Sequence, residues 1–358
     1  MPLSEARRLK ALPEPAIAVA LVGPGRVGQA LLAKFRRQQA DRRLVAIANS
    51  RQMLLGSDLD HCAWTGESAH VRSDTDLDQM IAWLQRFAGA KAVVIDATAS
   101  REVADRHADW LRRSLSVVTA NKWALAADEL RWQSLKAAWQ QQPEGYQASA
   151  TVGAGLPVLS TLTRLGRCGE TIHAFGGALS GSLNFLCGRI NAGVAPSWAL
   201  NEALSAGLTE PDPRQDLDGL DVARKLVILA RAAGYQLDLS EVRIDSLVAS
   251  EHAALPLGDY LSAGDEFDAH WHLCAGRAPG QGDRFVHVGR FDADKGARVG
   301  LERVESNHPL AGLTGAANLV EIYTDCYGEL PLTVAGPGAG TEVTALALWA
   351  DLEKLANS

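Results

Sequence analysis

The sequence has few cysteines, and none of them is placed for a disulfide framework or a zinc site. The five cysteines are odd in number and lie far apart, without any CxxC pairing. No stretch offers about twenty consecutive apolar residues, and the first residues lack the apolar core of a secretion signal. These absences argue against a secreted disulfide scaffold and against a membrane span, so we expect a cytoplasmic protein.

An excess of positive charge is also missing. The chain has 35 lysines and arginines against 42 aspartates and glutamates, a formal net charge of -7, and its basic residues are scattered. This distribution gives no footprint for nucleic acid and no polybasic membrane anchor, so the expected partner is a small-molecule substrate. At 358 residues and 47% apolar composition, the chain is long enough for two globular domains.

The segment that begins at Ile17 has the pattern of a dinucleotide-binding turn. The apolar run IAVALV is typical of a buried parallel strand, and GPGRVG and a helical pattern follow it at once. In such a turn the first glycine permits the bend, the second admits the pyrophosphate, and the third lets the helix pack on the strand. We therefore expect the cofactor to contact Gly23, Gly25, Arg26, Val27 and Gly28.

The second strand, LVAIA, ends in Asn49, Ser50 and Arg51, where an NAD-specific site usually carries an acidic residue for the ribose hydroxyls. Arg51, with Arg26 from the glycine turn, can instead pair with a 2'-phosphate. We therefore predict that NADP(H) is preferred over NAD(H), with Asn49, Ser50 and Arg51 beside it. The alternative is that both arginines only face solvent.

Polar residues follow two further apolar runs, KAVVID and LSVVT. In an open parallel sheet, ligands lie at the carboxyl ends of the strands. Thr98 and Ser100 after the first run, and Lys122 after the second, are therefore predicted to line the cofactor, with Lys122 pointing toward the nicotinamide or the substrate. The alternative for Lys122 is a helix flank on the surface.

The segment EPDPRQDLDGLDVARK, from Glu210 to Lys225, places five carboxylates and a lysine in sixteen residues. From Leu217 onward the apolar residues recur at helical spacing, which predicts a helix that stops near Gly234. Asp221 and Lys225 then share one face of that helix. The alternative is that they form an exposed i,i+4 ion pair, which contributes roughly 0.2–0.5 kcal/mol.

Two prolines, at positions 211 and 213, should hold the preceding segment extended and aim Glu210, Asp212 and Asp216 inward. Such an arrangement suits a small zwitterionic substrate. The carboxylates would bind an ammonium group, and a lysine would serve the reacting oxygen.

The composition changes after residue 150, which predicts two domains. We expect a Rossmann-type doubly wound α/β nucleotide-binding domain over 16–150, an α+β substrate and dimerisation domain over 151–340, and a last helix, 341–356, that packs back on the first domain. The loop TVGAGLP between them is either a hinge or a cation-binding turn. His270 and His272, spaced by two, are predicted to share one face of a strand, and no histidine is assigned to metal or catalysis.

The motifs GPGRVG, DATAS, ANK, TVGAGLP, SGSLNF, EPDPRQDLDGLDVARK and GPGAGTEVTALALWADL occur in this order, and with them the chain resembles homoserine dehydrogenase over nearly its whole length. It is most similar to the dehydrogenase portion of bifunctional aspartate kinase–homoserine dehydrogenases. The resemblance implies reversible NAD(P)-dependent interconversion of L-aspartate 4-semialdehyde and L-homoserine, the branch step toward threonine, methionine and isoleucine. It also implies a homodimer or homotetramer.

The resemblance assigns roles to individual residues. Lys225 and Lys122 match two lysines for which proton transfer has been argued, and Asp221 belongs with them. Glu210, Asp216 and Asp221 match substrate-binding carboxylates, and Gly340 matches a cofactor contact. Because an alcohol oxygen must exchange a proton as hydride moves, we favour Lys225 as the acid/base and Lys122 as the group that orients the carbonyl. The reverse assignment stays open.

One position departs from the family pattern. Family members commonly bind Na+ or K+ through an acidic side chain and the backbone carbonyls that match Val152, Ala154 and Leu156, but the acidic position here is Ser149. A cation would then rest on backbone carbonyls alone. Two other functions remain open: another Rossmann oxidoreductase of a small amino or hydroxy acid, and a non-catalytic NADP-binding paralogue.

Overall fold

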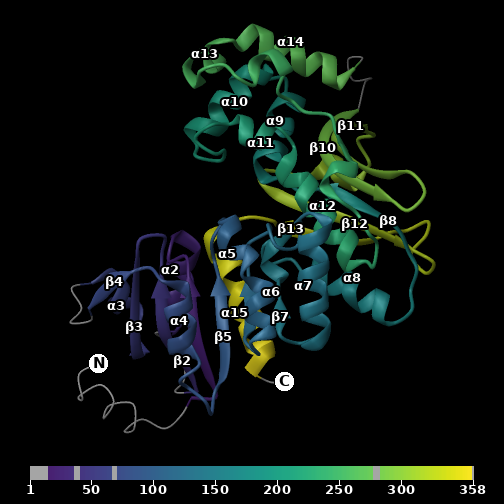
Figure 1. Cartoon of the computed structure of the whole chain (residues 1–358). Helices are drawn as coiled ribbons and strands as arrows, with labels where there is room; N and C mark the ends of the chain where they lie inside the picture. The colour runs from purple at the N-terminus through teal and green to yellow at the C-terminus, as the bar shows by residue number, and fades with distance from the viewer. Residues whose placement is uncertain (1–14, 36–40, 67–70, 277–282, 357–358) are drawn as a thin grey trace. The chain divides into compact units, whose positions relative to one another are not determined.

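The computed structural model describes residues 15–35, 41–66, 71–276 and 283–356. The chain divides into two compact units. The first comprises the described residues up to Ala154 together with those from Gly340 onward, and the second is Gly155–Ala339. The chain therefore leaves the first unit once and returns to it for its last helix, drawn in yellow (Figure 1).

A seven-stranded mixed sheet in the order β4-β3-β2-β1-β5-β6-β7 forms the centre of the first unit. Five strands run parallel: β1 (Ile17–Val22), β2 (Arg42–Ala48), β5 (Lys91–Asp96), β6 (Ser116–Thr119) and β7 (Tyr146–Gln147). Two antiparallel strands, β3 (Gln52–Leu59) and β4 (Arg72–Asp74), extend one edge. The predicted Rossmann-type α/β fold is confirmed, and the antiparallel edge is a feature that the sequence pattern did not predict.

Helices cover this sheet, and two of them, distant in sequence, share one hydrophobic cluster. Leu31 and Leu32 of α2 and Leu348 and Leu352 of α15 are buried with alternate residues of β1. Phe35 and Trp349 add an edge-to-face ring contact at 5.1 Å. The helices of the unit are α2 (Arg26–Phe35), α3 (His61–Thr65), α4 (Leu77–Leu84), α5 (Arg101–Asp105), α6 (His107–Arg112), α7 (Glu129–Gln141), the short 3₁₀ turn η1 (Ser149–Thr151) and α15 (Thr341–Ala356).

The order of the strands creates a switch point beside β1. From β1 the chain passes to β2 on one side, and after β3 and β4 it returns to β5 on the other side. In sheets of this kind, ligands bind outside the carboxyl ends of the two strands at the switch point. The glycine turn follows β1 and residues 97–100 follow β5, so both predicted cofactor segments lie at this point.

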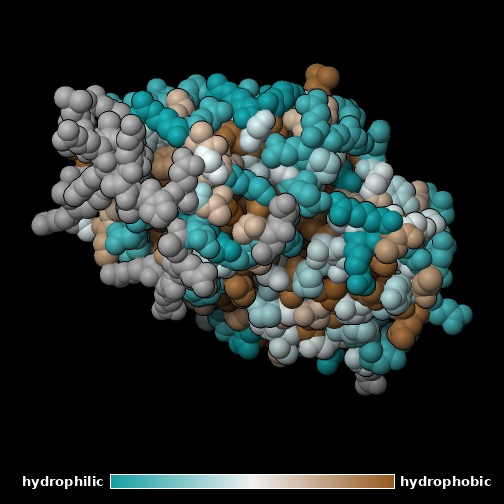
Figure 2. Space-filling model, turned by 90° about the horizontal axis from the view of Figure 1, so that it is seen from below, coloured by the Kyte–Doolittle hydropathy of each residue, from teal (hydrophilic) through white to brown (hydrophobic). Residues whose placement is uncertain are grey.

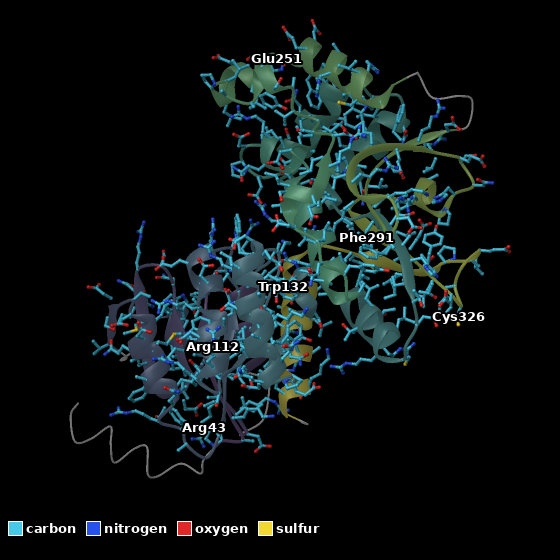
Figure 3. The ribbon with its side chains drawn as sticks, turned by 45° about the vertical axis from the view of Figure 1, so that its right-hand side comes forward. Arg43, Arg112, Trp132, Glu251, Phe291 and Cys326 are labelled. Atoms are coloured by element: carbon cyan, nitrogen blue, oxygen red, sulfur yellow. The ribbon has the colours of Figure 1, made fainter. Side chains whose placement is uncertain are left out.

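The second unit is built on a six-stranded sheet in the order β13-β12-β8-β10-β11-β9. All neighbouring strands are antiparallel except β9, which pairs parallel with β11. Phe175 of β8 stacks on Phe291 of β10, which is labelled in Figure 3, with ring centroids 4.9 Å apart. The strands are β8 (Ile172–Ala178), β9 (Val242–Ile244), β10 (Arg284–Asp292), β11 (Gly296–Val304), β12 (Ala317–Thr324) and β13 (Leu332–Pro337).

Helices follow and interrupt these strands, which gives the unit its α+β character. They are α8 (Val158–Arg167), α9 (Gly181–Asn191), α10 (Pro196–Ser205), α11 (Arg214–Leu217), α12 (Leu220–Ala232), α13 (Leu257–Ser262), α14 (Gly264–Ala275) and the 3₁₀ turns η2 (Leu239–Glu241), η3 (Ser250–His252) and η4 (Pro309–Gly312).

The strand predicted around His270 and His272 is wrong, because both residues lie on helix α14. Phe267 and Trp271, four residues apart, are the buried side chains of this segment. Residues four apart lie on the same face of a helix. The spacing of this buried pair therefore indicates the structure of the segment, and the two-residue spacing of the histidines does not.

Hydrophobic residues on the face shown in Figure 2 are interspersed with hydrophilic ones. Several large side chains, among them Trp198 and Leu273, are exposed. Within the described ranges, no helix is both long and apolar enough to cross a membrane.

Candidate active site

The glycine turn after β1 has the geometry that its sequence predicts. Gly23 has a φ of +92°, which favours glycine, and a Cβ added to Gly28 would lie 2.2 Å from the carbonyl oxygen of Gly23. A Cβ on Gly25 would meet no protein atom within 4 Å. Helix α2 therefore begins at Arg26, followed by Val27, directly after a glycine turn that has room for a ligand. The first N–H groups of this helix have no partner within the helix.

Asn49, Ser50 and Arg51 form the turn of the hairpin that joins β2 to β3. The side-chain oxygen of Asn49 accepts hydrogen bonds from the backbone N–H groups of Arg51 and Gln52, both at 2.8 Å. The side chains of Ser50 and Arg51 are exposed at this turn. The structure thus keeps the Arg51 guanidinium accessible at the carboxyl end of β2.

The predicted residues after β5 and β6 lie in two loops. Ser100 caps helix α5 by accepting from the N–H of Val103 at 3.3 Å, and the hydroxyl of Thr98 accepts from the N–H of Ser100 at 3.1 Å. Lys122 follows β6 and is half-buried. Gly340, with a φ of +132°, directly precedes α15 in the same unit.

The acidic segment of the second unit contains two helices instead of one. A short α11 ends at Leu217, and α12 begins at Leu220, because Gly219 between them has a φ of +79°. A Cβ at Gly219 would lie 2.9 Å from the side chain of Ile244, so glycine also allows close packing there. The predicted start of one helix at Leu217 is therefore wrong, whereas its predicted end near Gly234 agrees with α12, which ends at Ala232.

Lys225 is buried in the middle of this segment. Only 9% of the residue is exposed, and its ammonium group donates to the carbonyl oxygen of Leu179 at 2.7 Å. The carboxylate of Asp221 lies 2.7 Å from the same nitrogen. The i,i+4 ion pair considered as an alternative is present, but it does not lie on a fully exposed face: the Asp221 side chain is 42% exposed, whereas the Lys225 side chain is 11% exposed and its nitrogen is held between two oxygens.

Asp216 binds together two parts of the second unit that are distant in sequence. One of its carboxylate oxygens accepts from the hydroxyl of Ser182 at 2.8 Å, and the other accepts from the backbone N–H of Glu210 at 2.8 Å. The hydroxyl of Ser182 lies 3.0 Å from that of Ser180, the N-cap of α9. The Glu210 side chain is exposed, and the contact with Asp216 is made by the backbone N–H of Glu210.

Asp212 does not point inward as predicted, because its carboxylate is bound by Arg214 at 2.7 Å. The hydrogen bonds from Arg214 hold the pKa of Asp212 below its usual value. The same guanidinium donates to the carbonyl oxygens of His252, Ala253 and Leu255. Asp212 and Arg214 therefore brace the loop.

Asp218 is a carboxylate of this segment to which the sequence patterns assigned no role. Burial raises its pKa, and the negative charges of Asp216 and Asp221 add to that effect. Its side chain accepts from the N–H of Leu220 at 2.8 Å and so caps the entry to α12. The sequence contained a signal for including Asp218 among the site carboxylates, because it lies three residues before Asp221.

The loop matched to a cation site has an unusual backbone but lacks an available side-chain ligand. Ala154 has a φ of +50°, and Val152 is buried. Ser149 donates its hydroxyl and its backbone N–H to the buried carboxylate of Asp351, both at 2.8 Å, and the Lys354 ammonium lies 3.5 Å from the same hydroxyl. Among the residues that the structure describes, no group of three or more His, Cys, Asp or Glu could hold a metal. These contacts fit a cation poorly at Ser149.

The predicted residues separate by unit. The cofactor candidates, the glycine turn, residues 49–51, Thr98, Ser100, Lys122 and Gly340, belong to the first unit, and Glu210, Asp216, Asp221 and Lys225 belong to the second. A Rossmann-type sheet with a glycine turn at its switch point is typical of a nicotinamide-dependent oxidoreductase of the α/β class.

Comparison with known proteins specifies the family. The family model "Homoserine dehydrogenase, NAD binding domain" matches residues 23–144, and the model "Homoserine dehydrogenase" matches residues 157–352. The homoserine dehydrogenase of Emericella nidulans is 33% identical over 361 residues, which cover 95% of this chain and 98% of that protein. The chain belongs to the homoserine dehydrogenase family, a family of oxidoreductases of amino-acid biosynthesis.

Two further comparisons agree. Bifunctional aspartokinase/homoserine dehydrogenase 2 of Escherichia coli is 35% identical over 96% of this chain, but the chain spans only 44% of that relative's length. A putative homoserine dehydrogenase from Archaeoglobus fulgidus, known from its crystal structure, is 25% identical with a TM-score of 0.74, over 95% of this chain and 99% of that one. The predicted resemblance to this family is confirmed.

Proposed function

We propose that the chain catalyses the reversible NAD(P)-dependent reduction of L-aspartate 4-semialdehyde to L-homoserine. The observation that carries this proposal is the environment of Lys225. A buried ammonium group is held 2.7 Å from both the Asp221 carboxylate and the Leu179 carbonyl, in a segment with further carboxylates. Such a site can bind a small amino acid and exchange a proton with its terminal oxygen.

When bound, a nicotinamide cofactor would supply or accept the hydride at the terminal carbon of the substrate. As the carbonyl becomes an alcohol, its oxygen must gain a proton, and the reverse reaction must remove that proton. An ammonium group has three N–H donors, and two of those on Lys225 are directed at Asp221 and Leu179. The third can donate to the substrate oxygen, so we assign Lys225 as the acid/base.

The carboxylates of the second unit serve the other end of the substrate in this proposal. Asp216 is fixed by Ser182 and by the Glu210 backbone, so its charge keeps one position. Asp216, Glu210 and Asp221 are assigned to the substrate's ammonium group and its surroundings. Lys122, in the loop after β6, is assigned to orient the carbonyl group.

Turnover of three substrates tests the proposed reaction. With NADP+ present, L-homoserine should be oxidised, whereas L-malate and L-glutamate, whose chains end in a second carboxylate and carry no hydroxymethyl group, should not. Turnover of malate or glutamate in preference to homoserine would identify a different Rossmann oxidoreductase. Binding of NADPH without turnover of any of the three would identify a non-catalytic paralogue.

We further propose that NADP(H) is preferred over NAD(H), because the exposed Arg51 at the end of β2 can pair with the 2'-phosphate. An Arg51→Ala variant should raise the KM for NADPH by about tenfold and leave the KM for NADH nearly unchanged. Arg243→Ala, which removes an exposed arginine of the second unit, is the matched control. Equal losses with both cofactors would reject the phosphate contact.

Sodium or potassium, if bound, would be held by the backbone carbonyls of Val152, Ala154 and Leu156. We propose that turnover does not depend on this cation, because Ser149 replaces the acidic ligand and its hydroxyl donates to Asp351. Exchange of KCl or NaCl for choline chloride at constant ionic strength should then leave kcat unchanged. A strong and saturable activation by either cation would contradict this prediction.

A further inference from the structure

Four buried polar side chains lie together in the first unit, and no step of the proposed reaction uses them. They are Asp96, His107, Asn121 and Tyr146, and each is at most 2% exposed. They come from the end of β5, from α6, from the loop after β6 and from β7. Polar groups are costly to bury unless each finds a partner, so such a cluster needs a physical reason.

Asp96 is the centre of this cluster. One of its carboxylate oxygens accepts from the backbone N–H of Thr98 at 2.8 Å. The other lies 3.0 Å from the Nε2 atom of His107 and accepts from the side-chain amide of Asn121 at 2.9 Å. Three N–H groups from three segments of the chain can therefore be held by one carboxylate.

His107 contacts Tyr146 and Asp96 through its two ring nitrogens. Its Nδ1 atom lies 3.0 Å from the hydroxyl of Tyr146. Burial, and secondarily the charge of Asp96, raises the pKa of Tyr146 well above its usual value. A tautomer with its proton on Nε2 donates to Asp96 and accepts at Nδ1 from Tyr146, so it satisfies both contacts.

Asn121 extends the cluster into both candidate cofactor loops. Its side-chain amide donates to the carbonyl oxygen of Ser100 at 2.8 Å and lies 3.3 Å from the hydroxyl of Thr98. Its side-chain oxygen accepts from the N–H of Trp123 at 3.0 Å, on the far side of Lys122. The loop that holds Thr98 and Ser100 and the loop that holds Lys122 are thus joined through Asp96 and Asn121.

We propose that Asp96 and His107 are positioning residues that fix these two loops against each other for the nicotinamide end of the cofactor. This inference rests on the proposed function for its effect on turnover, but its effect on cofactor binding is independent of the substrate. Asp96 is the last residue of β5, and His107 is the first residue of α6. The carboxyl end of β5 lies at the switch point of the sheet, where a dinucleotide binds.

Two substitutions at His107 separate its contact with Asp96 from its contact with Tyr146. The amide nitrogen of glutamine occupies roughly the place of Nε2, so His107→Gln keeps a donor for Asp96. Asparagine reaches only as far as Nδ1, so His107→Asn keeps a polar group for Tyr146 but leaves Asp96 without this donor. Asparagine is one methylene group smaller than glutamine, so the two variants differ in volume as well as in the bond that matters here.

NADPH binding, measured by the change in nicotinamide fluorescence, is the first readout. His107→Asn should raise the Kd for NADPH by about tenfold, a typical effect for a group that orients a binding residue, whereas His107→Gln should stay close to the wild type. In turnover, His107→Asn should lower kcat and leave the KM for homoserine unchanged, because the substrate carboxylates belong to the second unit. Melting temperatures of both variants give the stability effect separately.

If His107→Asn does not fold, Tyr146→Phe replaces it, because this change removes only the hydroxyl that contacts Nδ1 of His107. It should weaken NADPH binding in the same direction. The proposal is overturned if His107→Gln and His107→Asn bind NADPH equally well, or if Tyr146→Phe leaves the Kd unchanged. A wild-type chain that binds NADPH but does not oxidise homoserine would reject the proposed function and leave this comparison valid.

Discussion

A Lys225→Ala variant should turn over homoserine about a thousandfold more slowly than the wild-type chain, since general acid–base groups contribute roughly 10²–10⁴ to rates. The buried ammonium group of Lys225 is the proposed proton donor, and alanine leaves nothing to replace it. NADPH binding should stay nearly intact, because the predicted cofactor residues belong to the other unit. Steady-state kcat and an NADPH titration measure the two effects.

Two lysine variants control this experiment. Lys295→Ala removes an exposed lysine of the same unit that pairs only loosely with Asp292 at 3.4 Å, and it should behave as wild type. Lys122→Ala should lower turnover less than Lys225→Ala. Near-normal turnover of Lys225→Ala would contradict its assignment as the acid/base, and a much larger loss at Lys122 would exchange the two roles.

An Asp216→Asn variant should lower kcat/KM for homoserine by about a hundredfold, the size expected when one partner of a desolvated charge pair is removed. Asparagine keeps the shape of the side chain and an acceptor oxygen for Ser182 or Glu210, but it removes the charge assigned to the substrate's ammonium group. The loss should appear mainly in KM, while the Kd for NADPH should not change.

Asp212→Asn is the contrasting variant in the same segment. Its carboxylate is bound by Arg214, so its loss should lower the melting temperature and leave the KM for homoserine close to wild type. Equal KM values for Asp216→Asn and the wild-type chain would remove Asp216 from the substrate site.

Local patterns in the sequence predicted the parts of the structure that depend on neighbouring residues. The apolar run at Ile17–Val22 and the glycine turn after it are local, and both have the predicted form. The break between α11 and α12 was missed because the apolar spacing continues across Gly219, and only its positive φ separates the two helices. The β3 strand and its hairpin after Arg51 were likewise missed, so Arg51 was expected at a plain strand end.

Local sequence patterns could not predict contacts between residues that are distant in the chain. Asp96, His107 and Tyr146 are separated by 11 and 39 positions, and Ser149 bonds to Asp351 across 202 positions. No spacing rule connects such residues, because the sheet order and the return of α15 bring them together. The burial of Lys225 also could not be derived from the sequence, since an i,i+4 pair has the same pattern on an exposed helix and on a buried one.

The reductive reaction tests the central claim most directly. The purified chain is mixed with NADPH and L-aspartate 4-semialdehyde, the loss of NADPH absorbance is followed, and the product is identified by mass spectrometry. The structure and the proposed roles of Lys225 and Asp216 predict that NADPH is consumed and that one L-homoserine forms for each NADPH oxidised. NADPH that remains unoxidised in the presence of the semialdehyde, with the chain folded and the cofactor bound, would contradict the account.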